Sequence, residues 1–125
     1  MKKLLVFILV IAGIGYWFKS LVQSGAVERY LDAHPNPALN PQVEYYWGVL
    51  LDLANHSQSA MYRYHRVVDK YPRSSSAPLA WVASIELLDD SRKALAESER
   101  FLAAYPDHPK AELVRRKISI IKNGY

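Results

Sequence analysis

The sequence predicts an all-α protein in which a short array of helical hairpins follows one N-terminal transmembrane helix. Three observations lead to this fold class. Two stretches match each other at one constant spacing, residues 4–18 form an uninterrupted apolar run, and no stretch alternates with the two-residue period of a strand. The matched pairs are Trp47 and Trp81, Leu53 and Leu87, Ala60 and Ala94, Tyr71-Pro72 and Tyr105-Pro106, and Ala77 and Ala111. We call the spacing from Trp47 to Trp81 the repeat offset.

Residues 1–22 are predicted to be a membrane anchor or a signal segment. With Lys19 snorkelling to the interface, residues 4–22 form a helix of about 28 Å, close to the roughly 30 Å of a bilayer's hydrocarbon core. A cleaved signal peptide explains the lysines and the apolar run equally well. Its candidate cleavage site, Ser24-Gly25-Ala26, lies well beyond the apolar run, so we expect an uncleaved anchor.

Charge predicts the orientation of this anchor. The segment before the apolar run carries Lys2 and Lys3 and no acid, whereas the residues after it mix basic and acidic side chains. The positive-inside rule therefore keeps the N-terminus in the cytoplasm and exports the rest of the chain. A domain that stays in the cytoplasm is the alternative.

Residues 23–40 are predicted to hold half of a degenerate repeat and a Pro-rich linker. The sequence of residues 28–35, which ends in His34-Pro35, is similar to that of residues 99–106, which ends in Tyr105-Pro106. The helix after the anchor therefore corresponds to the second helix of a repeat. The prolines from Pro35 to Pro41 separate it from the hairpins.

Residues 41–125 are predicted to form two full hairpins and a C-terminal capping helix. Asparagine before proline is typical of a helix start, serine of an N-cap, and a residue before proline of a helix end. These signals predict helices at about 41–54, from Ser57 or Ser59 to Lys70, at about 76–88, from the Asp89-Asp90-Ser91 turn to Ala104, and from Asp107 or His108 to Asn123-Gly124.

Composition limits the function classes. There is no cysteine, which excludes disulfides, thiolate zinc sites, thiol nucleophiles and a lipid-modified cysteine. The anchor segment holds 3 of the 16 basic residues, so 13 remain against 12 acidic ones, and we expect no nucleic acid as partner. The last segment is a local exception, because it has five basic residues and only one acidic residue, Glu112. The basic residues are Lys110, Arg115, Arg116, Lys117 and Lys122.

Catalytic and metal-binding motifs are missing from the sequence. There is no Gly-x-Gly-x-x-Gly, no phosphate loop, no Gly-x-Ser-x-Gly and no His-Glu-x-x-His. The four histidines lack close ligand spacing. We therefore expect no catalytic residue, no metal and no cofactor, and a binding function rather than an enzyme.

The repeat resembles the tetratricopeptide repeat. The resemblance covers residues 41–122 and depends on the period of the matched pairs, on Gly48 and Ala60 as small residues where two helices cross, on Tyr64, and on Pro72 at the end. The phrases Val-Val-Asp-Lys-Tyr-Pro-Arg-Ser and Phe-Leu-Ala-Ala-Tyr-Pro-Asp-His-Pro are similar to the divergent bacterial envelope branch of that family. The family's early tryptophan is missing from both copies, where Glu44 and Pro78 stand.

The resemblance implies that the first helix of each unit lines a concave binding face. The partner-binding residues expected from the matching positions are Tyr45, Val49, Asp52, Leu79, Ala83, Glu86, Lys110, Leu113, Lys117 and Ile120. Leu113 and Ile120 lie beside lysines and away from the inward stripe of the last helix, which is typical of a contact surface. Packing on Leu79, or ordinary scattered exposure, is the alternative explanation for both.

The basic pair Arg115-Arg116 in the last helix stands where the two earlier units carry Trp47-Gly48 and Trp81-Val82. A terminal repeat helix must meet water, so this change predicts a solvating cap. An acidic partner or phospholipid headgroups are the functional alternative for the basic cluster.

The resemblance and the anchor together predict a membrane-tethered protein–protein interaction module. We expect an adaptor or accessory subunit of a bacterial envelope complex, held in the inner membrane by residues 4–22 with its repeat domain in the periplasm and an envelope membrane protein as partner. The alternative is a secreted periplasmic binding module, released by cleavage, that binds peptides or envelope polymers. Self-association through the anchor or the unfilled repeat ends is a third alternative.

Overall fold

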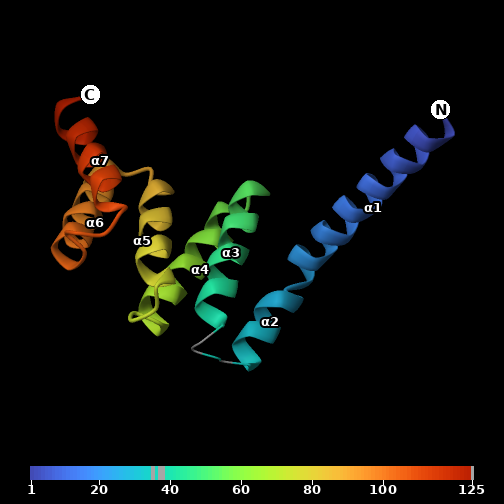
Figure 1. The fold of residues 1–125 in the computed structure, drawn as a ribbon, viewed down its shortest axis with the longest axis horizontal. Coiled ribbons are helices and arrows are strands. Elements are labelled where there is room, and N and C mark those ends of the chain that lie inside the picture. Colours follow the sequence, from blue (N-terminus) through green and yellow to red (C-terminus); the bar gives the residue numbers. More distant parts are fainter. Residues whose placement is uncertain (35, 37–38, 125) are drawn as a thin grey trace. The chain divides into compact units, whose positions relative to one another are not determined.

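The computed structural model describes residues 1–34, 36 and 39–124, and within these residues it contains seven α-helices and no strand (Figure 1). The predicted all-α fold class and the single apolar helix at the N-terminus are confirmed. The chain forms two compact units, Met1–Pro35 and Asn36–Tyr125.

The first unit contains α1 (Lys2–Ser24) and α2 (Ala26–Ala33). Helix α1 continues two residues beyond the predicted boundary at residue 22. It ends at Gly25, whose φ of 66° is the left-handed backbone that glycine adopts without strain. The Ser24 hydroxyl donates a hydrogen bond to the Leu21 carbonyl at 3.0 Å within the last turn.

Helix α1 is long and apolar enough to cross a membrane. The qualifying span is Lys2–Leu21, and none of it is buried in the protein. Length and composition alone give this result, and a signal sequence near an N-terminus passes the same test.

Helix α2 is the predicted helix after the anchor. It ends at His34, whose backbone N–H donates to the Tyr30 carbonyl at 3.0 Å. His34 has φ −127° and ψ 65°, a non-helical geometry, in keeping with the restriction that a following proline imposes. Pro35, Pro37 and Ala38 of the predicted linker lie outside the described residues.

The second unit contains α3 (Asn40–Leu53), α4 (Ser57–Lys70), α5 (Ser76–Glu86), α6 (Ser91–Ala104) and α7 (Ala111–Asn123). Each helix packs on the next in sequence, and α3 also contacts α5. The predicted boundaries agree to within about two residues except at the last helix. That helix begins at Ala111, because the Ala111 N–H donates to the His108 carbonyl at 2.8 Å in a turn that extends to Lys110.

The repeat offset is visible in the helices. Helix α4 shifted by this offset gives the bounds of α6 at both ends. Tyr71 and Tyr105, each before a proline, share nearly the same backbone, with φ and ψ of −128° and 55° in the first and −133° and 60° in the second. Each donates its N–H to the carbonyl four residues back, at 2.9 and 2.8 Å. The copied residues therefore end equivalent helices in the same way.

The core of the second unit has two parts. In the first, Leu51 on α3 and Ala60, Tyr64 and Val67 on α4 are buried. A second cluster joins Val82, Ile85, Phe101 and Val114 from α5, α6 and α7, with Trp81 and Ile118 packed against it. This second cluster holds the last three helices together.

Gly48 and Ala60 were predicted as the small residues where two helices cross, and the close contact at Gly48 is made by an aromatic ring. A Cβ atom at Gly48 would lie 2.6 Å from Cε1 of Tyr64. The Tyr64 ring, only 2% exposed, therefore occupies the space that glycine leaves open.

Candidate partner-binding groove

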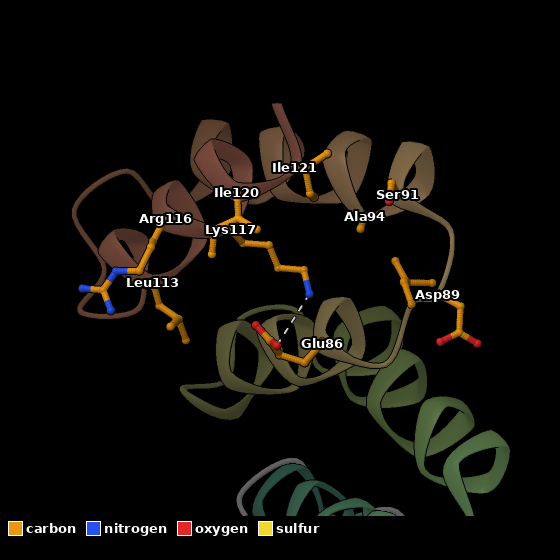
Figure 2. A pocket seen from close by; sticks show the side chains of 10 residues that line it. Glu86, Asp89, Ser91, Ala94, Leu113, Arg116, Lys117, Ile120 and Ile121 are labelled. Carbon is orange, nitrogen blue, oxygen red and sulfur yellow. Dashed lines mark ion pairs between the residues drawn. The ribbon is translucent and has the colours of Figure 1, made fainter. Parts of the chain in front are cut away.

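A groove of about 340 Å³ lies among α5, α6 and α7 (Figure 2). It contains four of the residues predicted to bind a partner, and we call it the α5–α7 groove. Its lining comprises Glu86, Leu88, Asp89, Ser91, Ala94, Leu113, Arg116, Lys117, Ile120 and Ile121.

The sequence of α7 explains which of its side chains reach the groove. Ala111 and Val114 are buried, and Ile118 packs against the second core cluster, so the inward stripe advances by steps of three and four residues. Leu113, Lys117 and Ile120 follow the same spacing on a neighbouring side of the helix. Figure 2 shows Leu113 and Lys117 on the side of α7 that faces α5.

The loop before α6 forms one end of the groove. Asp90 is the N-cap of α6, and its Oδ1 accepts hydrogen bonds from the backbone N–H groups of Arg92 at 2.8 Å and Lys93 at 3.3 Å. The cap fixes the start of α6, and with it Ser91 and Ala94 at the groove wall. Asp89, one residue earlier, is exposed and also lines the groove.

An ion pair joins the two walls of the groove. Lys117 Nζ on α7 lies 3.5 Å from Glu86 Oε2 on α5, with the two side chains 24% and 50% exposed (Figure 2). A pair this exposed contributes at most about 1 kcal/mol to stability, so a binding segment can separate it at little cost. The acidic groups of the groove lie on the α5 side and the basic groups on α7.

Arg116 supplies a second positive charge on α7. Within the described residues its guanidinium forms no ion pair, whereas Arg115 pairs with Glu112 at 3.4 Å and donates to the Pro106 carbonyl at 2.8 Å. Lys122 is also paired, with Glu99 at 3.7 Å. Arg116 is therefore the α7 arginine whose charge is available to a ligand in the groove.

Leu113 and Ile120 add apolar surface on either side of Lys117. They are 40% and 52% exposed and lie two helical turns apart on α7. Together with Ala94 and Ile121 they offer a partner side chain an apolar contact with charges on both sides. Such a combination of apolar centre and polar edge is usual for protein-binding surfaces.

The other six predicted binding residues lie outside the groove. Leu79 and Ala83 are partly buried on α5, and Lys110 is exposed at the start of α7. Val49 is partly buried on α3, where Asp52 accepts a hydrogen bond from the Ser57 hydroxyl at 3.3 Å. The structure therefore brings together Glu86, Leu113, Lys117 and Ile120, and leaves Tyr45, Val49, Asp52, Leu79, Ala83 and Lys110 elsewhere.

Tyr45, the sixth, belongs to an aromatic cluster in the first hairpin. Its ring lies 5.2 Å from that of Tyr46 and 6.0 Å from that of Tyr64. Burial and the neighbouring Tyr46 raise the pKa of Tyr45. Burial, Asp52 and Tyr45 raise the pKa of Tyr64 to about 12, so both phenols are protonated at neutral pH.

Six of the ten residues that line the groove are not among the predicted binding residues. The sequence predicts Arg116 as part of the solvating cap, and Asp89 only as part of the turn that it forms with Asp90 and Ser91. The signal that distinguishes the two aspartates is position, because only the residue directly before the first helical residue caps the helix, and that residue is Asp90. Ala94 stands out in the sequence only as the repeat partner of Ala60 and Ser91 only as part of a turn, and nothing in the sequence points to a binding role for Leu88 or Ile121.

A smaller cavity of about 240 Å³ lies among α4, α5 and α6. Its walls include His65, Asp69 and Trp81, and the Trp81 indole N–H donates to Glu97 Oε2 at 2.8 Å. Among the residues that the structure describes, no three histidine, aspartate or glutamate side chains are grouped so that they could hold a metal ion.

Comparison with known proteins gives no relative for this chain. No protein-family model, no curated protein and no solved structure matches it.

Proposed function

We propose that this protein is a membrane-tethered protein–protein interaction module, in which α1 is the anchor and the α5–α7 groove binds a segment of a partner protein. The observation that carries the proposal is the meeting of Glu86, Leu113, Lys117 and Ile120 in one groove. The resemblance to the tetratricopeptide repeat implies a binding role for all four, and they come from two helices that are separated in sequence by all of α6.

The helical array supports a TPR-like architecture for this module. Helices α4 and α6 have equivalent bounds at the repeat offset, and α3 contacts α5 in addition to the contacts between sequential helices. A stack of helical hairpins requires equivalent helices at a constant offset and contacts between neighbouring hairpins. Helix α2, with a helix end similar to those of α4 and α6, is the half repeat. Helix α7 corresponds to the capping helix, with Arg115 and Arg116 exposed to water.

The chemistry of the groove defines the kind of partner segment. An apolar side chain of the partner lies between Leu113 and Ile120, and a carboxylate beside it pairs with Arg116. Displacement of the exposed Glu86–Lys117 pair also makes Lys117 available to that carboxylate. The segment is a short helix or an extended strand, because a groove of about 340 Å³ accommodates only a few side chains.

The anchor sets the place of action and compensates for a small site. Binding restricted to one membrane surface raises the effective concentration of both proteins, so a weak contact suffices. We place the anchor in the inner membrane and the helical array in the periplasm. The protein then acts as an adaptor or accessory subunit of an envelope complex, with a membrane protein as partner.

Site-specific crosslinking tests the groove. A photoreactive amino acid at Leu113 in the full-length chain, expressed in its native membrane, should crosslink to a membrane protein. The same amino acid at Glu112, a 74% exposed side chain on the same helix, is the matched control. The Leu113 product should be lost when Ile120→Asp or Arg116→Glu is added. A product that is equally strong from Glu112, or unaffected by both substitutions, would exclude the groove.

A released periplasmic binding module is the second candidate. The observation that favours it is the break between α1 and α2 at Gly25, which places the candidate cleavage site Ser24-Gly25-Ala26 at a helix junction. Intact mass after membrane fractionation and a carbonate wash distinguishes the two candidates. Full length in the washed pellet supports the tether, and a soluble chain beginning near Val27 supports release.

A further inference from the structure

The charges that line the α5–α7 groove balance one another. Glu86 and Asp89 are acidic, Arg116 and Lys117 are basic, and the remaining lining side chains are neutral. The groove as a whole therefore attracts neither anions nor cations. A partner segment is selected by the order of its charges rather than by their sum, because complementary charges at an interface determine specificity.

The two unpaired charges lie at opposite ends of the groove. Figure 2 shows Arg116 at one end and Asp89 at the other. Within the part of the chain that the structure describes, neither side chain forms an ion pair. The ion pair of Glu86 with Lys117 lies between them (Figure 2). A ligand that separates this pair leaves the order of charges unchanged, since Lys117 directly follows Arg116 and Glu86 is three residues from Asp89.

The length of the groove suits a short helix. From Leu113 to Ile121 the groove follows eight residue steps of α7, or about 12 Å. A ligand helix covers that length in about two turns and brings its backbone hydrogen bonds already formed. This matters because Ser91 is the only neutral polar side chain in the lining. Residues seven positions apart lie on one face of such a helix, so their side chains can reach the two ends of the groove.

The basic residues of α7 do not form a uniform positive patch. Arg115, Lys117 and Lys122 each pair with a glutamate. A purely acidic segment, or a layer of anionic lipid headgroups, could pair with Arg116 but would place negative charge against Asp89 at the other end. Like charges brought together in this way oppose binding. The groove is therefore better suited to a segment that carries both signs.

We infer, on the basis of the binding function proposed for the α5–α7 groove, that the partner segment is a helix with an acidic and a basic side chain about two turns apart and an apolar side chain between them. The acidic side chain pairs with Arg116, and the basic one pairs with Asp89. The apolar side chain packs on Leu113 and Ile120. Asp89 is then a specificity-determining residue, because it discriminates against a segment with an acid at both ends.

Three synthetic peptides test this order of charges. Each is a helix with one central leucine, stapled on its far face, and is uncharged except at two positions seven residues apart. One peptide carries glutamate and lysine at these positions, one carries two glutamates, and one carries two lysines. Binding to the full-length chain in zwitterionic detergent micelles is measured from the NMR shifts of the Leu113 and Ile120 methyl groups.

The glutamate–lysine peptide should bind about fivefold more tightly than either of the others, which is the effect of one exposed ion pair. Asp89→Lys should reverse the order in favour of two glutamates, and Arg116→Glu should reverse it in favour of two lysines. Asp107→Lys is the matched control, because Asp107 is exposed, does not line the groove and gives the same change of charge. This control should keep the natural order, and circular dichroism checks that each variant retains its helix content.

Two results would overturn the inference while leaving the groove as a binding site. One is binding of the two-glutamate peptide at least as tight as that of the glutamate–lysine peptide. The other is equal binding of all three peptides that Ile120→Asp abolishes, which would mean that the groove binds a helix regardless of its charges. Methyl groups that shift with no peptide would overturn the groove together with the inference. Methyl shifts on addition of phosphatidylglycerol alone would assign the groove to lipid headgroups instead.

Discussion

Glu44 on α3 and Arg63 on α4 form an ion pair in the interior of the first hairpin. Arg63 Nη1 donates to Glu44 Oε1 at 2.9 Å, and the two side chains are 3% and 0% exposed in that order. Arg66 Nε donates to the same oxygen at 2.7 Å. The other carboxylate oxygen, Oε2, is buried without a hydrogen-bond partner. A buried carboxylate of this kind depends on its two arginines, because removing charges from water is costly unless they are paired.

Loss of one partner of this pair should destabilise the protein strongly. We expect Glu44→Ala to lower the free energy of unfolding by about 3–5 kcal/mol, since Arg63 would be left buried without its carboxylate. Chemical denaturation in detergent micelles measures the change.

The double variant Glu44→Leu/Arg63→Met is the control, because an apolar pair of similar volume has no charge to bury. It should recover most of the loss, and Arg66, 17% exposed, can turn to water. A double variant as unstable as Glu44→Ala would show that packing, rather than charge, dominates at this position.

Gly48 should not tolerate a side chain while Tyr64 is present. Alanine normally stabilises a helix interior by about 1 kcal/mol over glycine. Here its Cβ would lie 2.6 Å from Cε1 of a ring that is buried and cannot move away freely. We expect Gly48→Ala to cost about 1–3 kcal/mol, the usual range for overpacking, in the same denaturation experiment.

The sign should reverse when the ring is absent. In a Tyr64→Ala background, Gly48→Ala should stabilise the protein by about 0.5–1 kcal/mol, because only the helix propensity remains. If Gly48→Ala changed stability equally in both backgrounds, the ring would not be the reason for the glycine.

Helix boundaries were predictable because they depend on local chemistry. Tyr71 and Tyr105 precede prolines, and the geometry that a proline imposes on the residue before it ends α4 and α6 where the sequence predicts. Asp90, which belongs to the turn predicted before this helix, caps α6. The predicted start of α7 was wrong by three or four residues, because the backbone hydrogen bond from Ala111 to His108 closes a turn that no single residue signals.

The groove and the buried ion pair were less predictable because they depend on contacts between helices. In the sequence Glu44 stands out only because the tetratricopeptide repeat has a tryptophan at this position, and the two arginines that pair with Glu44 come 19 and 22 residues later on another helix. The resemblance to the tetratricopeptide repeat does imply that Glu86 and Lys117 belong to the same surface. The distance between Glu86 and Lys117, and the positions of Arg116 and Asp89 at the groove, depend on how α7 packs on α5 and α6.

Stability should fall at alkaline pH through Tyr64. Burial, Asp52 and Tyr45 raise its pKa to about 12 from the ordinary value of 10.0. Between these two values the unfolded chain loses the phenolic proton while the folded chain retains it. The unfolded state then binds fewer protons, so the free energy of unfolding decreases as pH rises from 10.0 to about 12.

Tyr64→Phe isolates this effect from the other tyrosines. We expect the variant to lose less stability than the natural chain between about pH 9 and about pH 11, measured by denaturation at each pH. Equal losses in the two proteins would show that the Tyr64 hydroxyl does not contribute to the alkaline dependence.

Substitutions at Asp89 and Asp90 should distinguish an effect on stability from an effect on partner binding. Asp90 accepts from two backbone N–H groups at the start of α6, so Asp90→Ala should lower the free energy of unfolding by about 1 kcal/mol. Asp89 is exposed at the groove and caps no helix among the described residues, so Asp89→Ala should change stability by less than about 0.5 kcal/mol. Denaturation of both variants side by side measures the difference.

If Asp89→Ala were the more destabilising of the two, the assignment of the cap to Asp90 would be wrong. If Asp89→Ala left stability unchanged but altered the yield of the Leu113 crosslink, the acidic end of the groove would be part of the partner's binding site.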